Sequence, residues 1–496
     1  MQGTEMIAPG ERVRCHPSVI VENSLSVVVL VALLVTRFET TAVAGVLAAA
    51  VVALLLFNYR QWKLTTIRFG ETEIVVERDT LFKMKKTLPY AKIAAVNVNR
   101  GIVNRLFGTS KLQININSGS SATVPEAVLT FREDTADELR SAILERLHDG
   151  EVVPDEDEPA ESLVSFSPAD VVVHGLFSVP TYQTTFGSVF LAYSIVELYT
   201  SAGAGFRGDG RALVSLLIFV ALQVAPAVSL IFRYYNYRVY RRGETIYLQH
   251  GFFRTYKTSF DVSRVNAVRV KSTLAARLLH RSWIEAEVVG LASGTGESLR
   301  PVLCLLKDDA TQQRLLRELV PEFVYDRNPE RQPEGARSML LIRAAAASLA
   351  LALAMAYPSL RVYHEAADLA GTAGTVLPWV LPLATLLGVL AIFYATRVSC
   401  RITEFDAGKD LFTFVNGAVD RETVVMNYDK VQTVQVERGP VAGFFGVARA
   451  RVYLLSSTGG ASISSGYFSG SRLGVIGETV MERIASGEYD WQKNSV

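Results

Sequence analysis

Cysteine and histidine are both scarce in this chain of 496 residues. The three cysteines, Cys15, Cys304 and Cys400, lie far apart and form no CxxC pair, which argues against a disulfide framework or a structural zinc site. The six histidines are scattered, and no two stand three or four residues apart, as a helical metal site requires. We therefore expect neither a metal nor a cofactor.

Motifs for catalysis and nucleotide binding are also lacking. The glycine-rich segments 203–210 and 466–474 contain neither the Lys-Ser/Thr of a P-loop nor a strand–GxGxxG–helix unit. No GxSxG elbow is present. Cys304 follows an apolar strand pattern, which is more typical of a core residue than of a nucleophile. We expect no catalytic residue and no enzyme.

The chain carries almost no net charge. Fifty Lys and Arg meet 49 Asp and Glu, giving +1, whereas a dedicated nucleic-acid binder normally has a basic excess. The hydrophobic content of 49% argues against disorder over most of the chain. A mean hydropathy of +0.24 is high for a soluble protein and low for one that lies mostly within a bilayer. The composition thus indicates a mixture of membrane segments and soluble domains.

The apolar residues cluster in three pairs of stretches separated by short polar breaks. The stretches are 18–36 with 42–57, 175–196 with 212–232, and 344–360 with 371–396. Crossing a bilayer takes roughly 20 apolar residues, and both 212–232 and 371–396 are long enough and free of charge. The alternative is a set of buried helices, but soluble domains rarely contain so much apolar helix. The pattern predicts six transmembrane helices in three hairpins.

Arginine and lysine gather beside the long polar segments. The short hairpin turns hold only Arg37, Arg207, Arg211 and Arg361. Because basic residues remain on the cytoplasmic side, we predict a multi-pass membrane protein with both termini and all long polar segments in the cytoplasm; the resemblance described below implies that the membrane is the plasma membrane.

The polar segments form an internal repeat. Alternating strand patterns at 73–76, 245–248 and 411–414 correspond, and Val98, Val270 and Val436 occupy one position of a later strand. Each unit ends with an amphipathic helical pattern, at 134–147, 308–320 and 471–484. Period-2 strands followed by one helix predict a strongly bent sheet or partial barrel with a helix packed on it.

Two motifs of the first unit resemble a known family. They are Leu88-Pro89-Tyr90-Ala91-Lys92-Ile93 leading to Val96, and Arg105-Leu106-Phe107-Gly108. Together with the preceding hairpin they resemble the bacterial pleckstrin-homology (PH) like, or membrane-flanked, domain, and three tandem units resemble its triple-domain branch of bacterial plasma-membrane proteins. The second unit has Leu279-His280 in place of Phe-Gly, and the third has Gly443-Phe444 in place of Arg-Leu.

The resemblance implies a seven-stranded bent barrel capped by a helix and no established catalytic activity. It also implies a role in envelope maintenance or in resistance to membrane-active peptides. Because PH-like folds serve many tasks, the likeness is informative about fold and weak about function.

We therefore expect an α+β multidomain membrane protein, with six transmembrane helices in three hairpins, each followed by a cytoplasmic PH-like bent β-barrel with a C-terminal helix. The expected segments are an N-terminal tail with hairpin 1 (1–57), PH-like domain 1 (58–148), an acidic linker (149–173), hairpin 2 (174–232), PH-like domain 2 (233–325), a linker (326–343), hairpin 3 (344–396) and PH-like domain 3 (397–490).

Two features are candidate sites. Lys83, Lys85 and Lys86 form a basic strand in the first unit, and clustered lysines near the cytoplasmic leaflet attract anionic lipid head groups; the alternative is a solvated strand face. Glu197 stands at the end of an expected membrane helix, where a carboxylate suggests a functional site; the alternative is a position at the far interface.

The sequence favours a non-enzymatic, membrane-tethered binding or scaffolding platform. Its expected partners are the bilayer, anionic lipid head groups, and an unidentified protein, either a related smaller membrane-flanked-domain protein or a second copy of this chain. No nucleic acid is expected. The alternative is a transporter or transporter component that uses the six helices as a bundle around Glu197.

Overall fold

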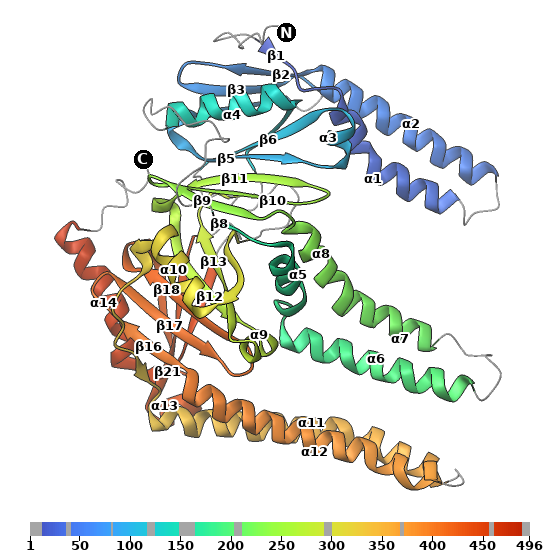
Figure 1. Ribbon diagram of the computed structural model, residues 1–496, viewed down its shortest axis with the longest axis vertical. Coiled ribbons are helices and arrows are strands. Elements are labelled where there is room, and N and C mark those ends of the chain that lie inside the picture. The colour runs from blue at the N-terminus through green and yellow to red at the C-terminus, as the bar shows by residue number, and fades with distance from the viewer. Residues whose placement is uncertain are drawn as a thin grey trace.

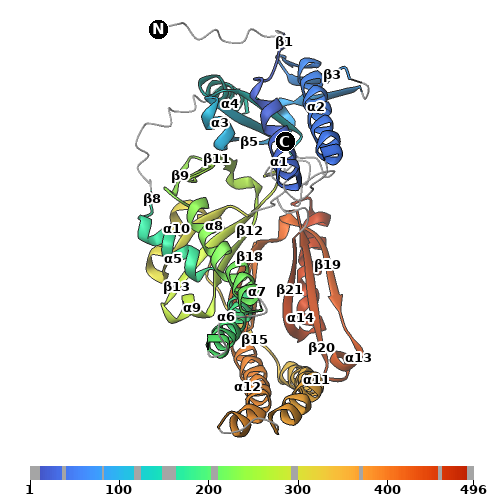
Figure 2. The ribbon, with the colours of Figure 1, turned by 90° about the vertical axis from the view of Figure 1, so that its right-hand side faces the viewer.

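The computed structural model describes residues 12–35, 41–80, 83–116, 125–147, 164–202, 211–291, 300–367, 372–455 and 461–488. Three helical hairpins project from one side of a body of sheets and short helices (Figure 1). We call the three repeated parts of this body unit 1 (65–147), unit 2 (238–323) and unit 3 (404–486). They follow one another through the body, and the turned view separates them (Figure 2).

Each unit contains six strands in two groups of three, followed by a helix. In unit 1 the elements are β2 (Thr65–Phe69), β3 (Glu73–Arg78), β4 (Met84–Pro89), η1 (Tyr90–Lys92), β5 (Ile93–Arg100), α3 (Ile102–Leu106), β6 (Thr109–Ile116), β7 (Ala127–Arg132) and α4 (Glu133–Leu147). Strand β1 (Arg12–Val13) pairs with β2. Ile74 and Val76 on β3 are buried between half-buried neighbours, as the period-2 pattern predicts.

Units 2 and 3 repeat this order. Unit 2 contains β9 (Arg238–Arg242), β10 (Thr245–His250), β11 (Thr255–Asp261), η3 (Val262–Arg264), β12 (Val265–Ser272), α9 (Leu274–Leu278), β13 (Arg281–Val288), β14 (Val302–Asp308), α10 (Asp309–Leu319) and η4 (Pro321–Phe323). Unit 3 contains β16 (Glu404–Ala407), β17 (Leu411–Gly417), β18 (Arg421–Asn427), η5 (Tyr428–Lys430), β19 (Val431–Glu437), α13 (Pro440–Phe444), β20 (Val447–Leu454), β21 (Ala461–Ser469) and α14 (Gly470–Ser486).

The strand pairing agrees with the alignment of the three units. Val98 lies opposite Leu112 in unit 1, Val270 opposite Ile284 in unit 2, and Val436 opposite Ala450 in unit 3. A slip of one residue would turn every side chain to the other face of the sheet. The repeat therefore extends to the register of individual residues.

The sheets run across the unit boundaries. Strand β5 of unit 1 pairs with β11 of unit 2, and β12 of unit 2 pairs with β18 of unit 3. The sheet orders are β7-β6-β5-β11-β10-β9-β8, with β8 (Val164–Ser165), and β14-β13-β12-β18-β17-β16-β15, with β15 (Glu330–Arg331). This pairing corrects the expectation of a self-contained barrel in each unit. Among the described strands, the two three-stranded groups of one unit do not pair with each other.

The hydrophobic cores also cross these boundaries. Ala95 of unit 1 belongs to the core of unit 2, and Ala267 of unit 2 belongs to the core of unit 3. Phe405, Phe412 and Phe414 are fully buried in unit 3. Burying side chains of this size contributes about 1.5–3 kcal/mol each. Ala267 of unit 2 packs into this core, so units 2 and 3 share its stabilisation.

The hairpins consist of long, exposed helices. Their bounds are α1 (Ser18–Val35) with α2 (Thr41–Lys63), α6 (Thr181–Ala202) with α7 (Arg211–Phe219), the π-helical turn η2 (Val220–Val224) and α8 (Ala225–Arg233), and α11 (Glu334–Ala367) with α12 (Thr372–Ile402). Four of the described helical spans are long and apolar enough to cross a membrane, not the expected six. They are Gly45–Lys63, Leu213–Arg233, Glu334–His364 and Pro378–Ile402.

The first helices of hairpins 1 and 2 are not among these four spans, and the described part of α1 counts as the shorter apolar helix Ser18–Ala32. Helix α1 docks on unit 1, where Glu22 pairs with Lys111 at 2.5 Å. In hairpin 2 the apolar stretch expected at 175–196 is divided. Its first residues lie in α5 (Pro168–Phe177), which begins at a capping box of Ser167 and Asp170 and packs against β14 and α8. Helix α6 starts only at Thr181.

A proline explains the irregular turn in hairpin 2. Pro226 has no backbone N–H, so it cannot donate to the carbonyl of Leu222 four residues earlier. The side chain of Gln183 on α6 donates its Nε2–H to that carbonyl at 2.6 Å. A neighbouring helix thereby satisfies the freed acceptor, as polar groups within a bilayer require.

A buried ionic network joins units 2 and 3. Arg269 on β12 donates to Glu287 at 2.6 Å and to Glu422 of unit 3 at 2.7 Å. Glu287 is fully buried and also pairs with Arg300. A buried carboxylate is tolerated only when such partners compensate for its lost hydration.

We predict that replacing Glu287 will destabilise this junction strongly. Glu287→Ala leaves the partly buried guanidinium of Arg300 without its carboxylate, and we expect a loss of about 3 kcal/mol in the free energy of unfolding. The matched control, Glu318→Ala, breaks the exposed pair with Arg314, which is screened by solvent, and should cost far less. Urea unfolding followed by circular dichroism measures both, and equal losses would contradict the prediction.

Candidate functional site

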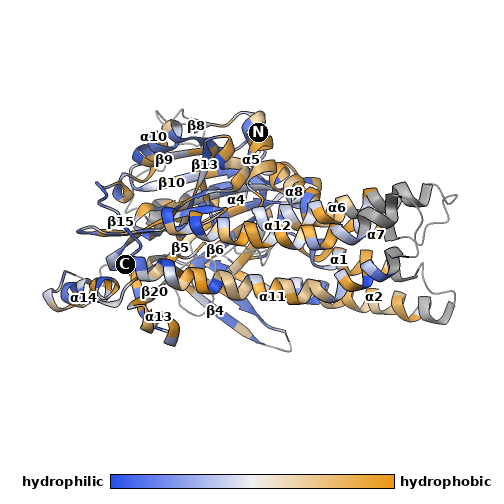
Figure 3. Cartoon of the chain, turned by 90° about the horizontal axis from the view of Figure 1, so that it is seen from below, coloured by the Kyte–Doolittle hydropathy of each residue, from blue (hydrophilic) through white to orange (hydrophobic). Residues whose placement is uncertain are grey.

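The bases of the three hairpins carry exposed apolar side chains. The short helices α3, α9 and α13 end on the first two of the four Arg-Leu-Phe-Gly positions of the repeat, and Leu106, Leu278 and Phe444 are 82%, 74% and 86% exposed. The hairpins themselves are largely hydrophobic (Figure 3). Large apolar side chains beside membrane helices are typical of groups that insert into the interfacial layer of a bilayer. We call the exposed apolar side chains at the base of each hairpin, namely Leu106, Leu278 and Phe444, the apolar feet.

An aromatic cluster extends the foot of hairpin 2. Phe232, the penultimate residue of α8, contacts Phe252 and Phe253 in the β10–β11 turn, with ring centroids 5.6 and 4.7 Å apart. The turn is tied to the helix end because Gly251 N–H donates to the Tyr235 carbonyl and Phe252 N–H donates to that of Phe232. Aromatic rings favour the level of the lipid head groups.

The arginines of the repeated motif fasten each unit to the next. Arg105 of unit 1 donates to Thr255 Oγ1 of unit 2 at 2.8 Å, and Arg277 of unit 2 donates to the Val419 carbonyl of unit 3 at 3.1 Å. In unit 3 the corresponding residue is Gly443. The motif was visible in the sequence, but its junction role was not.

Asp420 is a functional residue that the sequence reasoning missed. It lies in the β17–β18 turn of unit 3 and accepts hydrogen bonds from the backbone N–H groups of Thr181 at 3.0 Å and of Leu274 at 3.2 Å. These are the first residues of α6 and α9, whose first N–H groups have no partner within their own helix. A carboxylate also suits the positive end of a helix dipole. Unit 3 thereby anchors hairpin 2.

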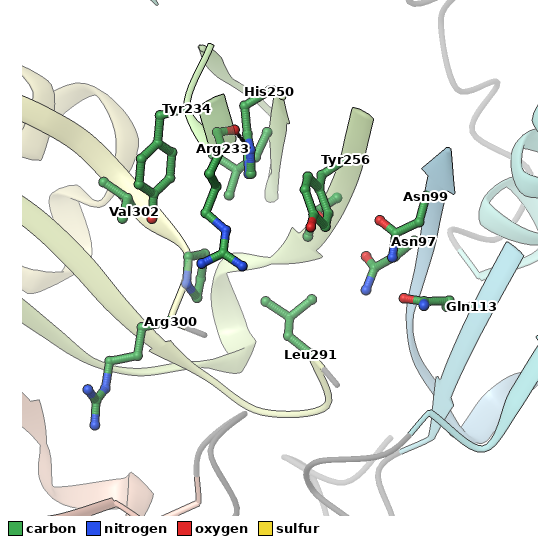
Figure 4. A pocket seen from close by; sticks show the side chains of 13 residues that line it. Asn97, Asn99, Gln113, Arg233, Tyr234, His250, Tyr256, Leu291, Arg300 and Val302 are labelled. Atoms are coloured by element: carbon green, nitrogen blue, oxygen red, sulfur yellow. Dashed lines mark hydrogen bonds between the residues drawn. The ribbon is translucent and has the colours of Figure 1, made fainter. Parts of the chain in front are cut away.

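A polar cavity of about 80 Å³ lies between units 1 and 2 (Figure 4). Asn97 and Gln113 enter it from β5 and β6, and Arg233, His250 and Tyr256 enter it from unit 2 and the end of α8. Asn97 Oδ1 and Gln113 Oε1 are buried and have no hydrogen-bond partner in the described part of the chain. Polar space of this size holds ordered water or one small polar group.

His250 enters this cavity as a neutral ring. Burial lowers the pKa of His250 to about 4. Its Nδ1 lies 2.8 Å from the carbonyl oxygen of Arg233 and donates to it, which fixes the tautomer. The ring also stacks on Tyr237 and Tyr256. His250 is therefore a structural donor at the end of the membrane helix.

The three candidate lysines all have carboxylate partners. Lys83 lies 3.3 Å from Asp79, Lys85 lies 3.6 Å from Glu77, and the Lys86 ammonium donates to Glu126 at 2.7 Å. Lys83 and Lys85 stay largely exposed, whereas Lys86 is partly covered. Lys85 and Lys86 lie on β4, and Lys83 directly precedes it. Contact of these lysines with lipid stays a prediction.

The remaining candidate residues, Glu197 and Cys304, lie on different elements. Glu197 belongs to α6, but its side chain lies outside the described residues. Burial raises the pKa of the Cys304 thiol to about 12, so this cysteine is a core residue as predicted. The described residues contain no group of three or more His, Cys, Asp or Glu side chains arranged to hold a metal ion.

We predict that unit 2 loses stability in mild acid. Burial lowers the pKa of both His174 and His250 to about 4, below the value of about 6.5 in an unfolded chain. Between pH 6.5 and 4 the unfolded state therefore binds more protons, so stability falls as the pH falls, by up to about 1.4 kcal/mol per pH unit for each histidine.

Unfolding at pH 7, 6 and 5, followed by tryptophan fluorescence, measures this slope, because Trp283 lies against His174. The His174→Gln and His250→Gln double variant should have a smaller slope. The exposed His280, which has a positive φ, provides the control His280→Asn, which should keep the full slope. A double variant with the full slope would refute the assignment.

Comparison with known proteins supports the repeat. A family model described as "Bacterial PH domain" matches residues 25–147, 186–319 and 341–485. The chain is 21% identical over 339 residues to the UPF0699 transmembrane protein YdbT of Bacillus subtilis (strain 168), covering 64% of this chain and 67% of that protein. No solved structure matches the chain. Because the family model covers most of the sequence in three successive copies, this chain belongs to the bacterial PH domain family and is a membrane protein.

Proposed function

We propose that this protein is a membrane-anchored binding platform in which three PH-like units form one continuous cytoplasmic body. The observation that carries the proposal is the pairing of β5 with β11 and of β12 with β18. Such pairing makes the three units one assembly, not three domains on flexible linkers. A body of this kind presents its surfaces in fixed positions at the bilayer.

The placement of the anchors supports the platform. The hairpins project from the same side of the body (Figure 1). Exposed apolar side chains, the apolar feet, lie at their bases. Three anchors hold the units close to the leaflet, so a lipid or a membrane-bound partner meets them at a high effective concentration. Envelope maintenance or resistance to membrane-active peptides is the biological role that we propose for such a platform.

The separation of the hairpins favours a platform over a transporter. Substantial helix–helix contacts within the described residues join the two helices of one hairpin, and hairpins 1 and 3 lie at opposite ends of the body. At most about a tenth of each of the four spans is buried. A transport path requires helices that pack around it and usually contains ionisable side chains.

The proposal is one of binding and not of catalysis. Reactive side chains among the described residues are dispersed: Cys304 is in the core of unit 2, and His174 and His250 are neutral and committed to structural hydrogen bonds. Nucleophilic catalysis requires a nucleophile within hydrogen-bond reach of a base. The exposed surfaces of the units are instead suited to contact other macromolecules.

We predict that the units face the cytoplasm. Lys92→Cys places an exposed thiol on unit 1, and Arg361→Cys places one at the far end of hairpin 3. In intact cells a membrane-impermeant maleimide should label only Arg361→Cys, and permeabilisation should expose Lys92→Cys. The unaltered chain gives the background from the three native cysteines. The reverse labelling pattern would overturn the orientation and leave the sheet assembly untouched.

We predict that the exposed lysines of unit 1 increase binding to anionic lipid. Each basic residue near the leaflet contributes about 1 kcal/mol, so Lys83→Glu with Lys85→Glu should weaken binding to vesicles with anionic head groups at least tenfold. The charge-matched control is Arg314→Glu with Arg317→Glu on α10. An equal loss in both pairs would show a general effect of net charge.

A further inference from the structure

Units 1 and 3 each present a sheet edge that is unpaired among the described strands. Strand β19 of unit 3 pairs with β20, and strand β4 of unit 1 pairs with β3; on their other sides neither has a partner strand in the described part of the chain. These are the counterparts of the strands that join the units inside the chain. Strand β19 corresponds to β5 and β12, and β4 corresponds to β11 and β18.

The two internal junctions have the same register. In the first junction Val98 of β5 lies opposite Lys257 of β11. In the second, Val270 of β12 lies opposite Thr423 of β18, which are the aligned positions one unit later. A single geometric rule therefore connects unit 1 to unit 2 and unit 2 to unit 3. Applied once more, it places Val436 of β19 opposite the residue that corresponds to Thr423 in unit 1, which is Lys85 of β4.

From this continuity we propose that β19 of one chain pairs with β4 of a second copy, in the antiparallel register that places Val436 opposite Lys85. The association is head-to-tail, so it extends the internal series of units from chain to chain and either closes a ring or continues as a row. It rests on sheet geometry alone and is independent of the platform function.

The high exposure of β19 supports its pairing with a strand of a second chain. Val98 on β5 is 4% exposed, whereas its counterpart Val436 is 43% exposed. Most of β19 is exposed, in contrast to β5, where all but the last residue is buried. An open edge strand is a template for pairing with another chain. Two internal junctions show how this fold uses that edge.

Charges near the edges are also complementary. In the first internal junction Lys257 of β11, the counterpart of Lys85, forms an ion pair with Asp137 on α4 at 3.5 Å. Lysine at this position is therefore compatible with a paired strand. Helix α4 follows β7 directly, as α14 follows β21, so Asp137 corresponds to Gly474.

A carboxylate lies beside this place in unit 3 as well. A Cβ atom added to Gly474 would lie 3.7 Å from Glu478 Oε1, so a carboxylate oxygen from α14 lies beside the position that corresponds to Asp137. Glu478 is exposed and has no ion pair among the described residues. In the proposed junction it meets Lys85 of the neighbouring chain.

The positions of the hairpins are compatible with repeating the internal junction between two chains. Both internal junctions leave the hairpins on one side of the body (Figure 1). Repeating the junction between chains therefore inserts the hairpins of the second copy into the same bilayer. No rearrangement of the described strands is required.

Disulfide crosslinking in membranes tests the proposal with the full chain. Two differently tagged forms, Lys85→Cys and Val436→Cys, are produced together and oxidised. We expect a disulfide-linked pair that contains both tags. Val98→Cys with Lys257→Cys in one chain provides the internal standard, because that pair is joined in the structure and should crosslink within the chain. The unaltered chain gives the contribution of its native cysteines.

The register is tested by moving one cysteine. Gln435→Cys in place of Val436→Cys turns the thiol to the opposite face of the strand, so the crosslink to Lys85→Cys should be lost. Glu478→Lys should reduce the yield of the original crosslink, whereas Glu482→Lys, one turn further along α14, should leave it nearly unchanged.

Three results would overturn the proposal. The first is no mixed-tag product while the internal standard forms. The second is an intramolecular disulfide when Lys85→Cys and Val436→Cys are combined in one chain, with no mixed-tag product from the separate forms, which would show closure of the three units on themselves. The third is a Gln435→Cys yield equal to that of Val436→Cys, which would show random collision.

Discussion

Backbone hydrogen bonding between the edges of successive units is the interaction on which the rest of this structure depends. Each unit leaves β5, β12 or β19 with one open side, and in the first two cases the following unit covers it. Buried backbone groups have to be paired, so these edges fix both the distance and the direction between units. The shared cores, the Arg269–Glu287–Glu422 network and the common direction of the hairpins all follow from that placement.

The repeat and most strands of this fold could be predicted from the sequence, because they rest on local patterns. Val98, Val270 and Val436 occupy equivalent register positions as aligned. The junctions could not be predicted in this way. An edge strand has the same alternating pattern whether it closes a barrel within its own unit or pairs with the next, and the residues that meet at the first junction lie over 150 positions apart.

The candidate site was predictable in its residue types and not in its contacts. The sequence identified the Arg-Leu-Phe-Gly motif, but the bond from Arg105 to Thr255 depends on how two units dock. Lys83, Lys85 and Lys86 were identified as a basic strand, while their partners Asp79, Glu77 and Glu126 come partly from other segments. Asp420 gave no signal at all, since a turn aspartate is common and the helix ends that it caps are distant.

The cap that Asp420 supplies imposes an order on assembly. Thr181 opens hairpin 2, and its partner Asp420 is 239 residues further along the chain. A ribosome completes α6 and α9 long before it reaches the β17–β18 turn. Until then the amino ends of both helices lack the carboxylate that satisfies them in the finished protein. Both helix ends therefore gain this partner only after the last unit has been synthesised.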